Sequence, residues 1–400
     1  MPDGKITLEE AHRRFKEPLP KLTAIKCSVI AYALRAFIVV ANYGLSLKEK
    51  IVTPANAPTL TKTYACRPKL SLRIFFPKTF DETADEKLPT VFTIHGGGFV
   101  MGDPRDDDHF NYTFANMHSV LVVALDYSKS PRVHFPTPTY DLEALILAAL
   151  SDSSLPIDQD RVAIMGSSAG GNLALSVSLL PSMCGSGDGV RRIKTAVPMY
   201  PVVNMSVRRE YKIQTRQWKP SFGGFRAKTT DMLFPLSPVF EAAYTLPGQD
   251  HHDPLLNPFF AEKEQLPPHI FFLACELDML AGEAWRMICG LTGREIGDET
   301  VGRETIGPRG ELILDDERYS FETKTKERSY RWLLIPDQIH AYDKYENLVL
   351  LHGDKELSKD AELKLAEAQK VIGKWLFEGP FAQCVQQPSK ARFGPFILLG

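Results

Sequence analysis

The sequence has little cysteine, and the six cysteines that it has are widely spaced along 400 residues. Zinc sites need closely spaced ligands, and small disulfide-rich domains need a dense cysteine framework. No two cysteines form a CxxC pair, so the sequence favours neither a zinc site nor a disulfide-rich domain. We therefore expect reduced thiols. They are Cys27, Cys66, Cys184, Cys275, Cys289 and Cys384.

The chain also lacks an excess of charge of one sign. Its 47 lysines and arginines and 49 aspartates and glutamates give a formal net charge of −2, without a long basic run. A protein that binds a nucleic-acid backbone needs clustered cationic side chains to neutralise the phosphates. We therefore expect no nucleic-acid partner.

Repeats, low-complexity segments and a secretory leader are not evident either. The first residues, MPDGKITLEEAHRRFKEPLP, are polar and contain acids, whereas a signal peptide has a basic start and an apolar centre. The overall composition, 44% hydrophobic and 24% charged, is typical of a globular domain. These features predict a folded, cytoplasmic protein.

One apolar segment, residues 24–44, is nearly long enough to span a bilayer. Arg35 lies near its middle, and an arginine at the centre of a bilayer costs about 2.5–3.5 kcal/mol on insertion scales. We therefore expect a buried or cap helix, with weak membrane contact as the alternative. The expected buried face comprises Ile30, Leu34, Phe37, Ile38 and Ala41.

From residue 88 onward, apolar runs of strand length alternate with helical patterns. This alternation predicts an α/β fold with a mostly parallel sheet and helices on both faces. Ligands bind such sheets beyond the carboxyl ends of the strands. The expected strands are 90–94, 119–128, 161–166, 195–203, 269–276 and 331–336, and the expected helices are 137–150 and 170–180.

Three stretches do not fit the alternation. We expect residues 1–60 to form an N-terminal helical cap segment and residues 61–400 to form the catalytic domain. That domain would carry a cap insertion at 204–253 and a charged insertion at 290–330. The alternative for each stretch is a surface insertion without a role in the site.

Two shorter segments within these stretches have a recognisable character. TRQWKPSFGGF, residues 215–225, is loop-like and aromatic, which is typical of a segment that faces substrate. ELILDDERYSF, residues 311–321, is expected to form a hairpin within the charged insertion.

Two adjacent serines in AIMGSSAGGNLAL, residues 163–175, are candidate nucleophiles. Only Ser168 has glycine two residues before it and two residues after it, at Gly166 and Gly170. A nucleophile at the tip of a sharp strand-to-helix turn leaves no room for larger neighbours. Because a predicted strand precedes Ser168 and a predicted helix follows it, we expect Ser168, and not Ser167, to be the nucleophile.

A serine hydroxyl is a weak nucleophile and needs a histidine base and an acid that orients this base. Among the histidines after Ser168, only His340, in IPDQIHAYD, follows the carboxyl end of a predicted strand. Asp278, in ACELDML, lies just past another strand and is the expected acid, with Glu276 as its competitor. The remaining histidines are expected to be solvated or structural: His251, His252 and His269.

The glycine cluster in IHGGGFVMG, Gly96 to Gly98, follows a predicted strand and suggests donors for an oxyanion. Glycine lets backbone N–H groups approach a substrate closely, and one such donor contributes about 2.7–4 kcal/mol to the transition state. Ala169 would supply another N–H from the start of a helix. A phosphate cradle is the alternative, but the sequence has neither the nucleotide-binding pattern GxxxxGK[ST] nor GxGxxG.

Together these motifs resemble the hormone-sensitive lipase family of α/β-hydrolases. The resemblance covers residues 88–343 and comprises HGGGFVMG, SSAGGNLAL, LPPHIFFLACELDML and IHAYD, in that order. It implies the α/β-hydrolase fold with a cap made by the N-terminal and inserted segments. It also implies a Ser168, Asp278 and His340 triad and an oxyanion hole of Gly97, Gly98 and Ala169, without cofactor or metal.

The sequence departs from the family pattern in three places. Ser167 stands where the family usually has an acid, and Gly282 replaces a second aspartate after the acid loop. The gap between Asp278 and His340 is about twice the usual spacing, because it contains the charged insertion. None of these departures removes a triad residue, but the insertion predicts an unusual mouth to the site.

The resemblance implies an intracellular serine esterase that acts through an acyl-enzyme on small to medium acyl groups, with a biosynthetic intermediate as one substrate class. The expected partner is therefore a small-molecule ester. Two alternatives keep the same pocket: acyl transfer or lactone chemistry with the same triad, and a receptor that binds a small molecule without catalysis. The sequence does not determine the oligomeric state.

Overall fold

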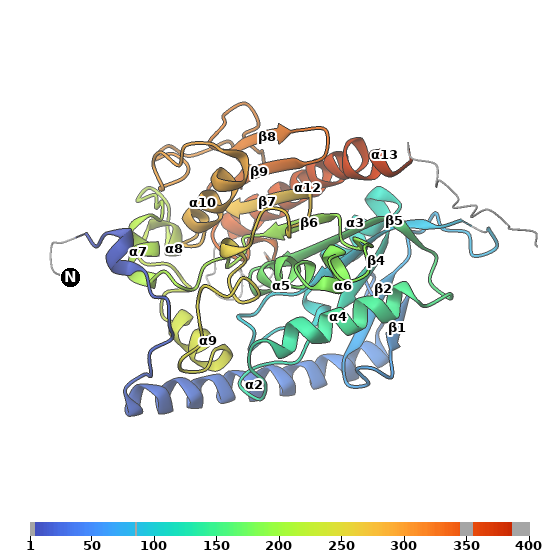
Figure 1. Ribbon diagram of the computed structural model, residues 1–400, viewed down its shortest axis with the longest axis horizontal. Helices are drawn as coiled ribbons and strands as arrows, with labels where there is room; N and C mark the ends of the chain where they lie inside the picture. Colours follow the sequence, from blue (N-terminus) through green and yellow to red (C-terminus); the bar gives the residue numbers. More distant parts are fainter. Residues whose placement is uncertain (1–4, 85, 345–354, 386–400) are drawn as a thin grey trace, which may run out of the picture.

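A nine-stranded sheet forms the centre of the protein in the computed structural model, which describes residues 5–84, 86–344 and 355–385 (Figure 1). The strand order is β1-β2-β4-β3-β5-β6-β7-β9-β8. Neighbours from β4 to β9 pair in parallel, and β1, β2 and β8 pair antiparallel at the edges. The mostly parallel sheet expected from the sequence is therefore confirmed. The strands are β1 Leu60–Thr63, β2 Ser71–Phe75, β3 Leu88–Ile94, β4 Leu121–Leu125, β5 Ile157–Ser167, β6 Thr195–Met199, β7 His269–Cys275, β8 Ser320–Lys324 and β9 Ser329–Ile335.

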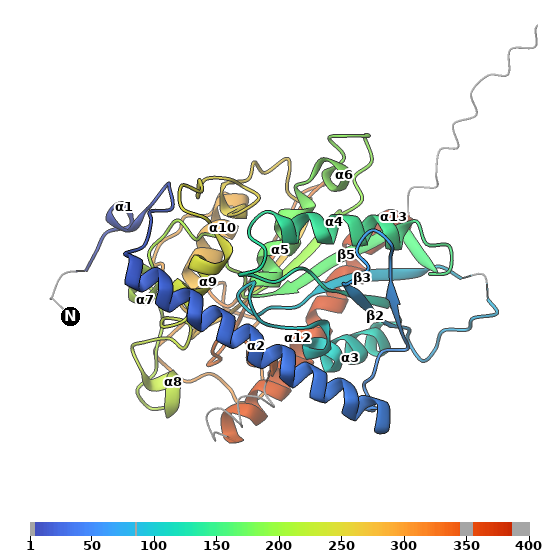
Figure 2. The same ribbon diagram turned by 90° about the horizontal axis from the view of Figure 1, so that it is seen from below.

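Helices cover both faces of the sheet because the central strands are buried on both sides (Figures 1 and 2). Helices α4, α5 and α10 contribute to one hydrophobic cluster, and α3 and α12 to a second one on the opposite face. Alternating residues of β5 divide between them, since Ile164 belongs to the first cluster and Met165 to the second. The helices are α1 Leu8–Ala11, α2 Lys21–Ile51, α3 Asp108–His118, α4 Thr137–Leu150, α5 Ala169–Ser178, α6 Pro181–Cys184, α7 Arg209–Gln214, α8 Gly224–Ala227, α9 Ser237–Tyr244, α10 Ala281–Thr292, α12 Lys355–Glu378 and α13 Pro380–Val385.

The strand register brings distant motifs to one edge of the sheet. Ile94 at the end of β3 pairs with Gly166 near the end of β5, so the glycine cluster and the paired serines leave the sheet side by side. Cys275 at the end of β7 pairs with Ile335 at the end of β9, which places the two following loops together. The carboxyl ends of these parallel strands therefore converge on a single region.

The hairpin in the charged insertion lies further along the chain than expected. The prediction of a hairpin at 311–321 is wrong: β8 pairs with β9, and the turn between them follows Lys324. Phe321 and Trp332 face each other across this pair and bury apolar surface, which residues 311–315 do not do as a set. The predicted strand at 195–203 is also too long, because β6 ends at Met199, where Tyr200 has a positive φ of 35° and Pro201 cannot donate to a ladder.

The apolar segment at 24–44 forms a helix, as expected, but of the two expected forms, a buried helix and a cap helix, the buried one is wrong. In α2 only Cys27 and Ala31 are buried; four residues of the expected face are half-buried, and Phe37 is 69% exposed. These two residues pack against α9, at Val239 and Ala243. Figure 2 shows α2 crossing one side of the molecule, and α2 contacts α9 there.

The five cysteines whose side chains the structure describes are all free: Cys27, Cys66, Cys184, Cys275 and Cys289. The remaining one, Cys384, lies outside the side chains that the structure describes. Most of the described thiols are buried in an apolar environment, and burial raises the pKa of Cys289 to about 11. Such thiols behave as small apolar side chains and not as reactive groups.

Candidate active site

Ser168 lies at the sharp turn between β5 and α5. Its backbone has φ 55° and ψ −116°, a conformation that costs energy for any residue with a Cβ. The two flanking glycines make this turn possible: a Cβ at Gly166 would lie 2.1 Å from the Gly170 carbonyl oxygen, and one at Gly170 would lie 2.1 Å from the Ile94 carbonyl oxygen. The glycine frame read from the sequence is therefore a steric requirement of the turn.

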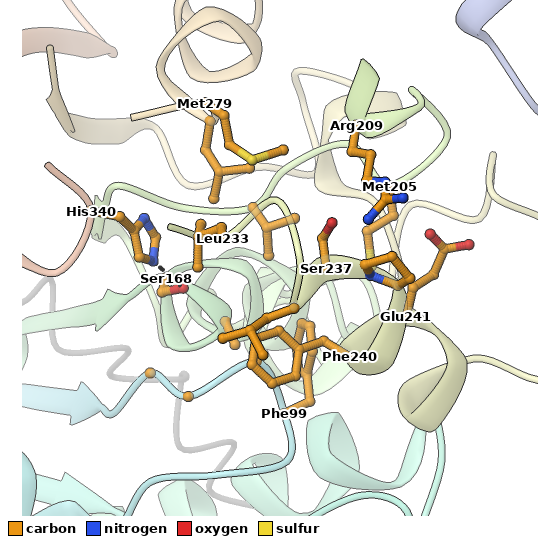
Figure 3. A pocket seen from close by; sticks show the side chains of 18 of the residues that line it. Phe99, Ser168, Met205, Arg209, Leu233, Ser237, Phe240, Glu241, Met279 and His340 are labelled. Atoms are coloured by element: carbon orange, nitrogen blue, oxygen red, sulfur yellow. Dashed lines mark hydrogen bonds between the residues drawn. The ribbon is translucent and has the colours of Figure 1, made fainter. Parts of the chain in front are cut away.

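His340 and Asp278 meet Ser168 although they are far away in the sequence. His340 Nε2 lies 2.8 Å from Ser168 Oγ, and His340 Nδ1 lies 2.7 Å from Asp278 Oδ2. The backbone N–H of Leu280 donates to Asp278 Oδ1 at 2.9 Å, which fixes the carboxylate. The three residues expected from the sequence are thus in hydrogen-bonding reach of one another, as Figure 3 shows for His340 and Ser168.

The charges around His340 stabilise the imidazolium that forms when the ring accepts a proton. Burial by itself lowers the pKa of His340, but Asp278, through its charge and hydrogen bond, together with Asp231 and Asp343, raises it above its ordinary value. The ring is also packed edge-on against Tyr200, with the ring centroids 4.9 Å apart. An imidazole held in this way can take a proton from a neighbouring hydroxyl.

Asp231, from the segment 204–253, is a second carboxylate beside the acid loop that sequence reasoning missed. Its Oδ2 accepts from the Met279 N–H at 3.0 Å and lies 3.2 Å from Arg216 Nε. Burial raises the pKa of Asp231, and the charge of Asp278 raises it further. No local motif marks Asp231, since only the folding of the segment 204–253 brings it here.

Glu276, the competitor for the acid role, is engaged elsewhere. Its Oε2 lies 2.8 Å from Lys219 Nζ, and its Oε1 accepts from the Tyr319 hydroxyl at 2.5 Å. Lys219 Nζ also donates to Asp337 Oδ1 at 2.5 Å, three residues before His340. This buried cluster ties the loops that carry Asp278 and His340 to each other, and Glu276 does not contact the imidazole.

The glycine loop offers unpaired donors next to the serine. Neither Gly97 nor Gly98 has an acceptor for its N–H among the residues that the structure describes. Ala169 is the first residue of α5, where helical N–H groups have no partner within the helix. Gly97 and Gly98 have positive φ values of 112° and 59°, and a Cβ at Gly98 would lie 2.5 Å from the Phe240 ring. The loop therefore needs glycine at both positions.

His95 and Tyr127 hold this loop from behind. Their rings stack with centroids 4.5 Å apart, and the Tyr127 hydroxyl donates to the carbonyl oxygens of His95 and Gly96 at 3.2 and 3.3 Å. His95 Nε2 lies 3.4 Å from Asp126 Oδ1. These contacts fix the loop before any substrate binds, as an oxyanion site requires.

The other histidines after Ser168 stay apart from it, as expected. His251 is buried, and burial lowers its pKa to about 4. His269 also has a pKa lowered by burial to about 4, and its Nδ1 lies 3.0 Å from Ser329 Oγ. His252 lies beside His12, with 3.3 Å between their Nε2 atoms. None of the three lines the pocket around Ser168.

A cavity of about 550 Å³ opens over Ser168 and His340. Its walls are mostly apolar, and Figure 3 shows Phe99, Phe240, Leu233 and Met279 around it. A volume of this size holds a small molecule of drug-like dimensions. On the side of the cavity away from Ser168, Glu241 forms ion pairs with Arg13 and Lys16, at 3.1 Å from each.

The segments that line this cavity differ in part from those expected. Residues 1–60 and 204–253 both contribute to the lining, but no residue of 215–225 does, so the prediction that this stretch faces substrate is wrong. Its Arg216 and Lys219 bond to the back of the acid loop instead. The charged insertion 290–330 also contributes no lining residue and packs behind that loop, through Thr305 and Tyr319.

Within the described part of the chain, no group of three or more His, Cys, Asp or Glu side chains is placed to hold a metal ion. The carboxylates near Ser168 have protein partners: Asp278 bonds to His340, and Asp231 to Arg216.

Comparison with known proteins gives a consistent set of relatives. A family model described as the alpha/beta hydrolase fold matches residues 91–301, about half of the chain. An arylesterase of Saccharolobus solfataricus is 29% identical over 198 residues, which cover 49% of this chain and 60% of the relative. Versiconal hemiacetal acetate esterase of Dothistroma septosporum is 28% identical over 211 residues, with 51% and 61% covered. The chain thus spans less than two thirds of the length of these curated relatives.

Solved structures show the same fold at lower identity. A thermostable esterase from Pseudomonas putida matches with a TM-score of 0.57 and 18% identity, covering 90% of this chain and 91% of the other. An esterase of Pyrobaculum calidifontis matches with a TM-score of 0.56 and 20% identity, covering 90% and 99%. At these identities the matches support the fold and not the substrate.

Proposed function

This chain belongs to the α/β-hydrolase fold family, as its resemblance to the hormone-sensitive lipases predicted, and from this we propose that it is a serine esterase. The observation that carries the proposal is the continuous chain of contacts from Asp278 through His340 to Ser168. A histidine with a purely structural role does not need to lie between a carboxylate and a strained serine at the floor of a cavity. This arrangement therefore supports a catalytic role.

In the proposed reaction, His340 Nε2 takes the proton of Ser168 while Oγ attacks the acyl carbonyl carbon. Asp278 keeps the proton on Nδ1, so that Nε2 is free to accept, and stabilises the imidazolium that forms. The N–H groups of Gly97, Gly98 and Ala169 bind the developing oxyanion. His340 then protonates the leaving alkoxide, and an acyl-enzyme remains on Ser168.

In the second half, His340 takes a proton from water, which attacks the acyl carbon. The tetrahedral oxyanion again lies against the three N–H donors. Collapse breaks the bond to Ser168 Oγ, which recovers its proton from His340, and the carboxylic acid leaves. The mostly apolar walls of the cavity leave room for an apolar acyl or alcohol group.

We propose the domain division that was expected from the sequence. Residues 1–60 and the insertion 204–253 would act as the cap, because both line the cavity over Ser168. The insertion 290–330 would instead buttress the acid and histidine loops of the catalytic domain 61–400. We propose a small to medium acyl group, since one relative is named for an acetate ester and the cavity walls are mostly apolar.

Covalent labelling tests this function directly. A fluorophosphonate probe should modify the protein at Ser168 alone, as mapped by mass spectrometry of the digested chain, because only an activated serine reacts. The p-nitrophenyl esters of acetate and butyrate should be cleaved faster than longer esters. Product analysis with an added alcohol would separate hydrolysis from acyl transfer. Binding of a small acid without any labelling would instead favour the receptor alternative.

The pH dependence of kcat/KM should follow the fraction of molecules in which the His340 imidazole is neutral. Only the neutral ring can accept a proton, and its pKa is raised above the ordinary value of 6.5, so activity should decline as the pH falls through a midpoint above 6.5. A kcat/KM profile for p-nitrophenyl acetate, corrected for hydrolysis without enzyme, measures this midpoint. The Asp231→Asn variant should lower it, since Asp231 helps to raise that pKa. A wild-type midpoint below 6.5 would contradict the assignment.

Ser167→Ala should retain most of the activity. Ser167 is buried, and its hydroxyl has no hydrogen-bond partner among the described residues, so the substitution removes an unpaired polar group. We expect kcat within about threefold of the wild type and an unchanged or slightly higher Tm. Steady-state kinetics and a thermal melt measure both. A loss of activity as deep as that of Ser168→Ala would show that the roles of the two serines were misassigned.

A further inference from the structure

The outer face of α2 is apolar, whereas the outer face of an ordinary surface helix is polar. A helix at the surface of a soluble protein buries an apolar stripe and presents polar residues to water. In α2 the residues at helical spacing on the side away from the body are apolar and exposed, with Val29 62% and Val40 70% exposed. The outward residues are Leu22, Ile25, Val29, Ala33, Ala36, Val40, Tyr43, Leu47 and Ile51.

Cationic side chains lie at both ends of this apolar face. Lys21 and Lys26 are exposed near the start of the helix, and Lys48 and Lys50 near its end. None of the four has an ion-pair partner among the residues that the structure describes. The one acid of α2, Glu49, is already 2.8 Å from Arg105 Nε. In a chain of net charge −2, this helix is therefore a local positive patch.

The helix is fixed along the body and not free to turn away from it. Near its start, Cys27 and Ala31 are buried against α9. Near its end, Arg105 donates to Ser46 Oγ at 3.0 Å and to Glu49 Oε1 at 2.8 Å. By length and composition alone α2 could cross a bilayer. Because both ends are held to the same side of the protein, it would lie along a lipid surface instead (Figure 2).

We propose that the outer face of α2 docks on a membrane with anionic headgroups, with the helix lying in the plane of the interface. The valines, leucines, isoleucines and Tyr43 would enter the boundary of the acyl chains, and the four lysines would meet the lipid phosphates. Phe37 and Tyr32, which are also exposed, would lie at the level of the headgroups.

The helix that carries this surface also borders the cavity over Ser168, with a different face. Ile38 of α2 and Leu19, just before the helix, both line that cavity. Docking would hold the cavity beside the lipid phase, where apolar esters concentrate. That consequence rests on the proposed esterase function, whereas the docking itself does not.

Vesicle sedimentation of the full chain tests the proposal. The probe is vesicles of about three parts phosphatidylcholine to one part phosphatidylserine, with pure phosphatidylcholine for comparison. We expect binding to the mixed vesicles that weakens as the salt concentration rises, and at least tenfold weaker binding by the double variant Val29→Glu with Val40→Glu. The matched control is Val190→Glu with Ile306→Glu, two exposed apolar residues elsewhere, and it should bind like the wild type.

A second pair of variants separates charge from apolar contact. Lys26→Gln with Lys48→Gln should lose roughly tenfold in binding to the mixed vesicles and nothing with pure phosphatidylcholine. Thermal melts and cleavage of soluble p-nitrophenyl acetate without vesicles establish that each variant is folded. A protein that does not hydrolyse the ester but binds vesicles would overturn the proposed function and leave this inference standing.

Three results would overturn the proposal. The first is absence of wild-type binding, or equal binding by the α2 glutamate variant and its control. The second is a wild-type dimer in light scattering that the α2 glutamate variant alone dissociates, since the face would then join two copies. The third is resistance of vesicle-bound protein to alkaline carbonate, because α2 would then span the bilayer.

Discussion

Replacing Ser168 with alanine is expected to lower kcat for p-nitrophenyl acetate by about 10⁴-fold to 10⁶-fold. The variant loses the oxygen atom that His340 activates at 2.8 Å, and no other hydroxyl among the described residues is hydrogen-bonded to His340 Nε2. KM should change little, because a serine hydroxyl adds little to binding of the ground state. The residual rate should come from the N–H donors around the oxyanion, which alanine leaves in place.

Ser237→Ala is the matched control for this measurement. Ser237 lines the same cavity (Figure 3), and its hydroxyl donates to the Phe234 carbonyl oxygen at 3.3 Å. Since it does not contact His340, its loss should change kcat by less than about tenfold. Activity of Ser168→Ala within tenfold of the wild type would remove the basis of the proposed mechanism.

Asp278→Asn is expected to cost about 10⁴-fold in kcat, even though the two side chains have the same shape. The Leu280 N–H donates to Asp278 Oδ1, so an asparagine would place its amide oxygen there and its NH₂ group toward His340. His340 Nδ1 would then have to accept a hydrogen bond. Its proton would move to Nε2, the nitrogen that must be free to accept the proton of Ser168.

Asp231→Asn distinguishes this effect from a general loss of negative charge. Asp231 is buried beside the same loop and pairs with Arg216, but it does not contact the imidazole. We expect a loss of kcat below about tenfold together with a lower Tm, because Arg216 would lose its buried partner. If both variants lost activity equally, long-range charge and not the orientation of His340 would explain the role of Asp278.

The core of the fold and the three central residues could be read from local patterns. Each of the strands β3, β5, β7 and β9 contains a short apolar run, because the centre of a parallel sheet covered by helices is buried on both faces. Chemistry in such sheets lies beyond the carboxyl ends of strands, so Ser168, Asp278 and His340 were identified from the strand that each one follows. The strand register brings the loops that carry them to the same edge of the sheet.

The contacts of the inserted segments could not be read in this way. The stretch 215–225 is aromatic and loop-like, and such a composition does not indicate whether a segment faces a cavity or packs behind it. In the structure Arg216 and Lys219 point to the carbonyl and carboxylate groups of the acid loop. Asp231 was missed for the same reason, since its partners Met279 and Arg216 are distant or unmarked in the sequence.

The sequence by itself was enough to predict the parallel sheet, the glycine-framed turn at Ser168, and His340 and Asp278 as the residues that meet it. Each of these follows from periodicity or from a steric need within a few residues. Only the tertiary structure decided the surroundings of these elements. It paired Glu276 with Lys219, and it left most of α2 exposed, although a buried helix was one of the two forms predicted for this segment. The burial of a side chain and the choice of its partners depend on segments that are distant in the sequence. The apolar composition of a segment therefore does not show whether protein or another apolar phase covers it.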